Sequence, residues 1–228
     1  MAIKRVTRKQ LLKEPDEFFT LTGRVLAWVK AHPRQLTMGA AVLAAAVLIV
    51  SGYRFFNERS AREASRLLSQ GLETYRQQME SQDPAKALEA VQADFDELVK
   101  AYRGQPAGRL GHIYYGQILL AAQKTREALA LLEQARDDFD DDPALANIIF
   151  NNLAAAYLQS GDKAAAMAQY EKIVSGANAT HKDTALFQLG VLYLESDQAE
   201  KGRQMLKQLG EDFPDSTYAE MAREKIAG

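Results

Sequence analysis

The sequence predicts an all-α protein, in which one N-terminal transmembrane helix precedes a solenoid of repeated helix pairs. Three observations lead to this fold class. No charged residue occurs between Gln35 and Tyr53. The remaining chain alternates apolar stripes of helical period with short turns, and no window alternates with the period of a strand. With 228 residues and 47% hydrophobic content, the chain can also bury a substantial core.

Charge is divided unequally along the chain. Residues 1–34 carry 8 Lys or Arg against 3 Asp or Glu, whereas the remaining residues carry 20 against 27. A basic tail favours proximity to anionic phosphates, and an acidic body argues against nucleic-acid binding. Cysteine is absent, which excludes a disulfide framework, a thiolate nucleophile and a sulfur metal site.

We expect residues 35–56 to form the transmembrane helix. At 1.5 Å per residue the uncharged stretch reaches roughly 28 Å, close to the thickness of a bilayer core. Arg34 and Arg54 close it, and aromatic residues suited to the interface flank it, namely Trp28, Tyr53, Phe55 and Phe56. The alternatives are a buried soluble helix and a cleaved signal peptide. The stretch before the span, residues 1–34, is too long for the n-region of a signal peptide, and no A-x-A-like site follows Val50. We therefore interpret the segment as an uncleaved signal anchor.

The orientation of this span follows from the tail, residues 1–34. Basic residues close to the span are nearly balanced on its two sides. A short tail with eight basic residues is harder to translocate than a long acidic domain. We therefore predict a single-pass membrane protein with a cytoplasmic N-terminus and a domain over residues 57–228 on the opposite side of the membrane.

Part of the tail has the spacing of an amphipathic helix. Its apolar residues recur at helical intervals before Pro33, namely Phe18, Leu21, Val25, Trp28 and Val29. Two interpretations remain open. The segment is either an interfacial helix on the inner leaflet or a partly ordered anchor without a partner.

Beyond the span, an apolar stripe without any turn signal continues to Met79, so we expect one uninterrupted helix. Asp83 followed by Pro84 predicts the start of the next helix, which should run toward Arg103. Further turns are expected at residues 123–125, 160–162 and 196–198. A closing helix after Pro214, capped by Asp215 or Ser216, should cover the last repeat.

The helices match the 34-residue tetratricopeptide pattern. The clearest unit contains Phe150, Leu153, Ala154, Tyr157, Ala166 and Tyr170. Gly116, Ala154 and Gly190 hold one register, where a small side chain lets two helices approach closely. The first unit is degenerate and retains only Ala87 and Val91, as a terminal repeat can.

Taken together, these features resemble a known family. The acidic and aromatic stretch 15–19, one span, and a repeat domain ending in the motif of residues 213–219 resemble the YfgM-like ancillary subunits of the SecYEG translocon. The resemblance implies an inner-membrane protein with a periplasmic repeat domain. It also implies association with SecYEG and with the membrane-anchored chaperone PpiD, and it supplies no catalytic residues.

No motif for catalysis or metal binding is found. His32, His112 and His181 are far apart in sequence, and His112 occupies an aromatic position of the repeat, where a core histidine is expected. The acidic run 137–142 lacks the glycine and glutamate of a calcium loop. We instead expect Asp142 to cap the next helix, and Thr180 with Asp183 to form a capping box. We predict no enzyme activity, cofactor, metal or small-molecule substrate.

The predicted site is a groove along the first helix of each pair. In this repeat type, positions 2, 5, 9 and 12 point into the concave surface. Positions 5, 9 and 12 are Ile113, Gln117, Leu120, Asn151, Ala155, Leu158, Phe187, Val191 and Leu194, and position 2 adds Leu110, Ile148 and Thr184. The cationic clamp of carboxylate-binding repeats is missing, with Asn152 its only matching residue. An apolar extended segment or an amphipathic helix is therefore the expected ligand.

Two alternatives accompany this prediction. Neighbouring helices, including the closing one, could fill the groove from within. The function could be translocon-associated chaperoning of emerging proteins, or a structural scaffold for another envelope complex in secretion, division or outer-membrane assembly.

Overall fold

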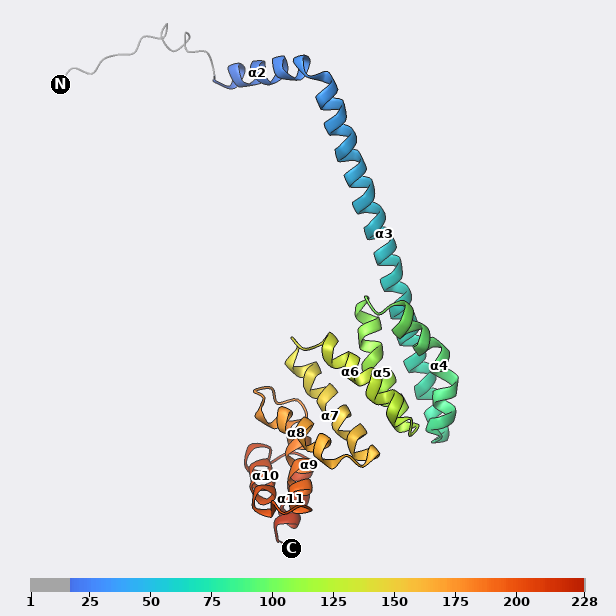
Figure 1. The fold of residues 1–228 in the computed structure, drawn as a ribbon, viewed down its shortest axis with the longest axis vertical. Coiled ribbons are helices and arrows are strands. Elements are labelled where there is room, and N and C mark those ends of the chain that lie inside the picture. The colour runs from blue at the N-terminus through green and yellow to red at the C-terminus, as the bar shows by residue number, and fades with distance from the viewer. Residues whose placement is uncertain (1–16, 228) are drawn as a thin grey trace, which may run out of the picture. The chain divides into compact units, whose positions relative to one another are not determined.

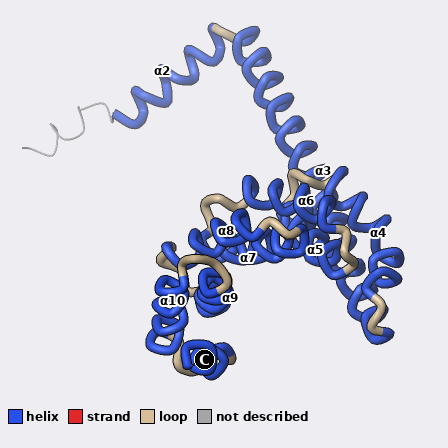
Figure 2. Tube along the Cα trace, turned by 60° about the horizontal axis from the view of Figure 1, so that its bottom comes forward, coloured by secondary structure: helices blue, strands red, loops and turns tan. Residues whose placement is uncertain are grey.

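The computed structural model describes residues 17–227, with side chains from residue 23 onward. Within this range every regular element is a helix (Figure 2). The predicted tail up to residue 16 and the side chains of Phe18 and Leu21 lie outside the described part. The chain divides into two units, residues 1–58 and 59–228, which are described separately. The predicted all-α fold class is confirmed.

The first unit contains α2 (Glu17–Ala31) and the beginning of α3 (Pro33–Gln78). The helices separate at His32, because Pro33 has no N–H with which to continue the hydrogen-bond ladder of α2. In the described chain, α3 is the one helix long and apolar enough to cross a membrane, and its apolar window is unburied. By length and composition it can serve as a membrane anchor or a signal sequence. It continues without interruption into the second unit, as the apolar stripe predicted.

The second unit is a series of helix pairs (Figure 1). The last turns of α3 and the short η1 (Met79–Ser81) lead into α4 (Pro84–Ala101), followed by α5 (Pro106–Ala121) with α6 (Thr125–Asp138), α7 (Pro143–Ser160) with α8 (Lys163–Ser175), α9 (Lys182–Leu194) with α10 (Ala199–Asp212), and the closing α11 (Tyr218–Ala227). From α4 to α11 each helix packs against the next. The boundaries agree with the predicted turns.

Aspartate caps explain where several helices begin. The Asp83 carboxylate accepts hydrogen bonds from the backbone N–H groups of Ala85 and Lys86, both at 3.1 Å. Asp142 accepts equivalent bonds from Ala144 and Leu145, at 3.0 and 3.1 Å. A proline follows each cap at the first helical position, where its missing N–H costs no bond. Both starts were predicted.

The predicted capping box of Thr180 and Asp183 is wrong. His181 precedes α9 in a left-handed conformation with φ of 56°, and no side chain caps the helix. The Asp183 carboxylate instead accepts a hydrogen bond from the Ser216 hydroxyl at 2.6 Å. Ser216 also accepts from the Tyr218 N–H at 3.2 Å, so it is the residue that caps α11. The Asp183 carboxylate thus joins the start of α9, through the Thr184 N–H at 2.7 Å, to a residue 33 positions away.

Small residues allow close helix crossings within each pair. A Cβ atom added at Gly116 would lie 2.8 Å from Leu132, and one at Gly190 would lie 2.8 Å from Leu206. Ala154, the third member of this register, is fully buried. The degenerate first unit contains a similar close crossing, since a Cβ at Gly71 would lie 3.0 Å from Phe95. The repeat pattern did not predict that crossing.

The closing helix buries the apolar side of the last repeat. Ala222 of α11 joins Phe187, Leu206 and Leu209 in one core cluster. The Tyr218 ring stacks on Phe187 with centroids 4.9 Å apart. This terminal capping agrees with the predicted role of the last helix.

Replacing Ala154 by Leu should overpack the crossing between α7 and α8. We expect the free energy of unfolding of residues 59–228 to fall by roughly 1 to 3 kcal/mol in urea titrations. Ala155 is the matched control, because it is exposed on the same turn and Leu differs little from Ala in helix propensity. Equal stability of the two variants would contradict the repeat register.

Candidate functional site

An apolar cavity lies between the first helices of two successive pairs, α5 and α7. Its volume is about 210 Å³, and it is lined by Leu110, Ile113, Tyr114, Gln117, Leu145, Ile148 and His181. Four of these residues belong to the predicted groove positions, namely Leu110, Ile113, Gln117 and Ile148. None of the lining residues is lysine, arginine, aspartate or glutamate.

Three of the lining residues do not occupy the repeat positions from which the groove was predicted. Tyr114 follows Ile113 on α5 and keeps 38% of its surface exposed. Leu145 belongs to the first turn of α7, which Asp142 caps. His181 comes from the connection before α9, and its left-handed backbone could not be inferred from a helical pattern.

The middle of the predicted groove is less enclosed. Ala155 is exposed, whereas Leu120, Asn151 and Leu158 are half-buried. The Leu120 carbonyl accepts a hydrogen bond from Gln159 at 3.2 Å, which ties the end of α5 to the end of α7. These residues lie outside the lining of the 210 Å³ cavity.

The part of the predicted groove on α9 is covered by the chain itself. Phe187 is only 6% exposed and lies against Tyr218 of α11. Val191 and Leu194 pack against the same cluster. At this end the closing helix therefore fills the surface. This agrees with the alternative that the chain's own helices fill the groove.

One buried amide beside the groove has no partner among the described residues. The Nδ2 atom of Asn152 makes no hydrogen bond, although the residue is only 9% exposed. Asn152 holds the repeat position that Tyr114, a cavity residue, holds in the preceding pair. A buried donor without a partner is costly, and Asn152 lies outside the residues that line the 210 Å³ cavity.

The buried histidine is part of the core. The His112 side chain is enclosed, and its Nδ1 lies 2.9 Å from a carboxylate oxygen of Asp138. Arg109 donates to the Asp138 carbonyl at 3.3 Å, and its guanidinium lies over the Phe139 ring. Across residues 23–227, whose side chains the structure describes, no three histidine or acidic side chains gather as a metal site.

Two larger clefts lie along the second helices. One, of about 500 Å³, is lined by Arg136, Asp137, Asp140, Ala146 and Phe150, and the other, of about 400 Å³, includes Glu171, Tyr193 and Lys201. Their charged side chains are solvated or paired, so size alone does not make them the better binding site. The cavity between α5 and α7 is smaller, but none of the residues that line it is lysine, arginine, aspartate or glutamate.

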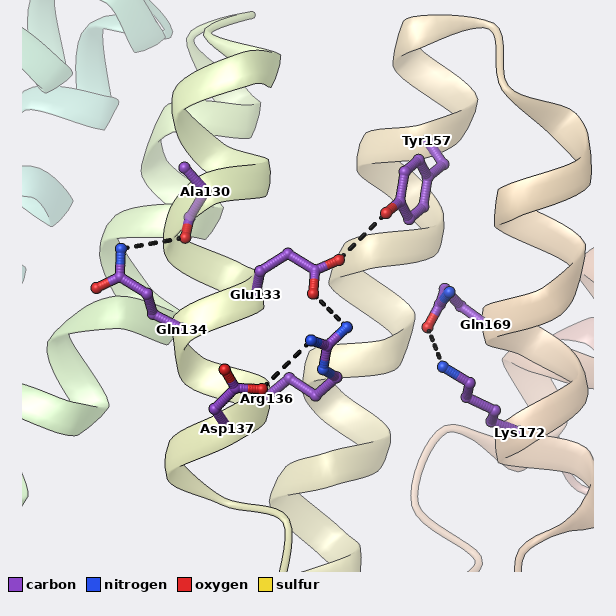
Figure 3. Close-up of polar contacts among 8 residues, drawn as sticks. All are labelled: Ala130, Glu133, Gln134, Arg136, Asp137, Tyr157, Gln169 and Lys172. Atoms are coloured by element: carbon purple, nitrogen blue, oxygen red, sulfur yellow. Dashed lines mark hydrogen bonds and ion pairs between the residues drawn. The ribbon is translucent and has the colours of Figure 1, made fainter.

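Tyrosine hydroxyls link each first helix to the preceding second helix. Tyr157 donates to the Glu133 carboxylate at 3.2 Å, and Glu133 also pairs with Arg136 (Figure 3). Tyr193 donates to Glu171 at 2.5 Å, at the equivalent positions of the next repeat. These bonds fix the spacing between successive pairs and hence the width of the groove.

Hydrogen bonding and burial both raise the pKa of tyrosines in the repeats. The hydrogen bond to Glu171, together with burial, raises the pKa of Tyr193 to about 12. Burial is the main cause that raises the pKa of Tyr170 to about 12. The unfolded chain loses these phenolic protons near pH 10, earlier than the folded chain. Stability from these tyrosines is therefore present below pH 10 and lost as the pH rises toward 12.

Replacing Tyr193 by Phe should weaken this alkaline destabilisation. We expect a loss of about 1 kcal/mol at neutral pH, because the Glu171 hydrogen bond is removed, and a shallower fall in unfolding free energy between pH 10 and pH 12. Urea titrations across that range measure both effects. Tyr114→Phe is the control, since the Tyr114 hydroxyl has no hydrogen-bond partner in the described chain; an equal response from both variants would contradict the role of the bond.

Comparison with known proteins agrees with this architecture. A family model described as a tetratricopeptide repeat-like domain matches residues 27–184, and a tetratricopeptide repeat model matches residues 184–216. No curated protein and no solved structure matches the chain significantly. Repeats of this class are protein-binding scaffolds that typically lack catalysis. Because the first match covers more than half of the sequence, the chain belongs to the tetratricopeptide repeat-like domain family.

Proposed function

We propose that the protein is a membrane-anchored module that binds apolar segments of other proteins as they emerge into the periplasm, in association with the translocon. The observation that carries the proposal is the uncharged cavity between α5 and α7. Its 210 Å³ is below the usual range for a drug-sized ligand, which favours a side-chain anchor of a peptide over a complete small molecule.

The chemistry of the cavity supports an apolar ligand. Leu110, Ile113, Leu145 and Ile148 supply apolar surface, and Tyr114 adds an exposed aromatic ring. A ligand held by buried area should bind with little dependence on salt, because no lysine, arginine, aspartate or glutamate lines the cavity.

The partner is inferred from the membrane helix and the family resemblance. The exposed apolar window of α3 supports anchoring in the inner membrane, and the basic tail supports a cytoplasmic N-terminus. The resemblance to YfgM-like subunits supports SecYEG and PpiD as partners. The second candidate is a scaffold for another envelope complex, which the same repeat surface would also serve.

Topology can be tested with reporters fused after the C-terminus. A phosphatase that requires the periplasm should be active there, and a reporter that functions only in the cytoplasm should be silent, because the basic tail resists translocation. The opposite pattern would place the repeats in the cytoplasm and contradict the proposed association with the translocon.

The groove can be tested by photocrosslinking in cells. A photoreactive residue at Tyr114 should capture partner proteins, whereas the same residue at Met221 should not, because Met221 is at least as accessible but lies on α11, outside the cavity lining. Mass spectrometry of the adducts identifies the partner. SecY, PpiD or secreted chains would support the adaptor, another envelope machine would support the scaffold, and equal capture at both positions would exclude the groove.

A Tyr114→Ala variant gives an independent measure of binding. Loss of its aromatic surface should reduce capture by a photoreactive residue placed at exposed Ala155, with an unchanged helical spectrum and melting temperature. Met221→Ala removes a comparable exposed side chain elsewhere and should leave capture intact.

A further inference from the structure

Helix α2 carries an exposed apolar face that the proposed groove does not explain. Val25, Leu26, Trp28 and Val29 are 58%, 58%, 53% and 37% exposed. At about 100° per residue these four side chains fall within an arc of roughly 160° on one side of the helix. The other side carries the small residues Gly23, Ala27 and Ala31.

Basic residues border this apolar face on both edges. On the same helical projection, Arg24 lies roughly 40° beyond Trp28, and Lys30 lies roughly 40° beyond Leu26. Both are exposed. Arginine and lysine can lay their hydrocarbon stems along an apolar surface while the charged ends remain in water. The arrangement is that of a helix lying at a boundary between an apolar phase and anionic groups.

The position of α2 next to the candidate span strengthens this interpretation. Pro33 ends the hydrogen-bond ladder, so the apolar face of α2 is a separate feature and not an extension of α3. Trp28 lies in the last turn of α2, and its ring stacks on His32 with centroids 5.1 Å apart. Tryptophan is enriched at the level of lipid headgroups.

We infer that α2 binds the surface of an anionic lipid bilayer through the face formed by Val25, Leu26, Trp28 and Val29. Charge complementarity favours this occupant, because residues 1–34 carry 8 basic against 3 acidic residues. A second copy of the helix fits poorly, since Arg24 and Lys30 would bring like charges together at the edges of the contact. The adjoining span would hold α2 at the bilayer, so even weak intrinsic binding is sufficient.

The single tryptophan of the chain makes this inference directly testable. The purified full-length protein is placed in vesicles of phosphatidylglycerol and phosphatidylcholine without any other protein. Trp28 should show blue-shifted emission, resist quenching by acrylamide and be quenched by lipids brominated on the acyl chains. A water-like spectrum without quenching by brominated lipid would overturn the inference.

Because Trp28 lies close to the span, a pair of relocated tryptophans provides the decisive control. One variant combines Trp28→Phe with Val25→Trp on the apolar face, and the other combines Trp28→Phe with Ala27→Trp on the opposite face. Both positions are exposed, so neither change disturbs a core. Brominated lipid should quench the tryptophan at position 25 several-fold more than that at position 27. Equal quenching would show that α2 does not lie on the bilayer by this face.

The basic edges predict a dependence on lipid charge. Raising the phosphatidylglycerol fraction should increase quenching by brominated lipid in the parent protein, and Arg24→Gln with Lys30→Gln should reduce that increase. Protection from acrylamide without quenching by lipid would indicate contact with another protein copy. Protection that arises only when purified SecYEG is added would indicate a protein partner. Either outcome would overturn the lipid assignment.

Discussion

Close approach of the two helices in each pair is the constraint on which the repeat unit depends. At Gly116 and Gly190 the side chain of a leucine from the second helix occupies the space where a Cβ would stand. Ala154 is the largest residue in this register and is fully buried. Only at this separation can the apolar residues of both helices interlock, and the distance set inside each pair determines where the next pair packs.

Much of this architecture could be predicted because it is encoded locally. The aspartate caps before Pro84 and Pro143 and the turns between helices depend on residues a few positions apart, and the register of small residues recurs with the repeat. Gly71 was missed because Phe95 follows it by 24 positions, whereas Leu132 follows Gly116 by 16. The extra length of the first hairpin hid an equivalent crossing from a fixed repeat pattern.

The candidate site was harder to predict because it depends on contacts between distant segments. Counting repeat positions indicated Ile113, Gln117 and Ile148, but it could not detect that Tyr218 covers Phe187. The same limit explains Asp183, whose carboxylate accepts a hydrogen bond from Ser216, 33 residues away, besides the one from the adjacent Thr184 N–H. His181 lines the cavity because its backbone is left-handed in the connection before α9. A histidine in the sequence does not predict that conformation.

The closing helix also restricts how this repeat array can change in evolution. Tyr218 and Ala222 occupy the face to which a further helix pair would have to dock. Duplication of a pair at the C-terminal end would therefore leave either α11 or the new repeat without its apolar contacts. Duplication inside the array, between α5 and α8, would preserve both boundaries and lengthen the surface available to partners. Variation in repeat number among relatives should accordingly arise from internal insertions, with the terminal helix retained.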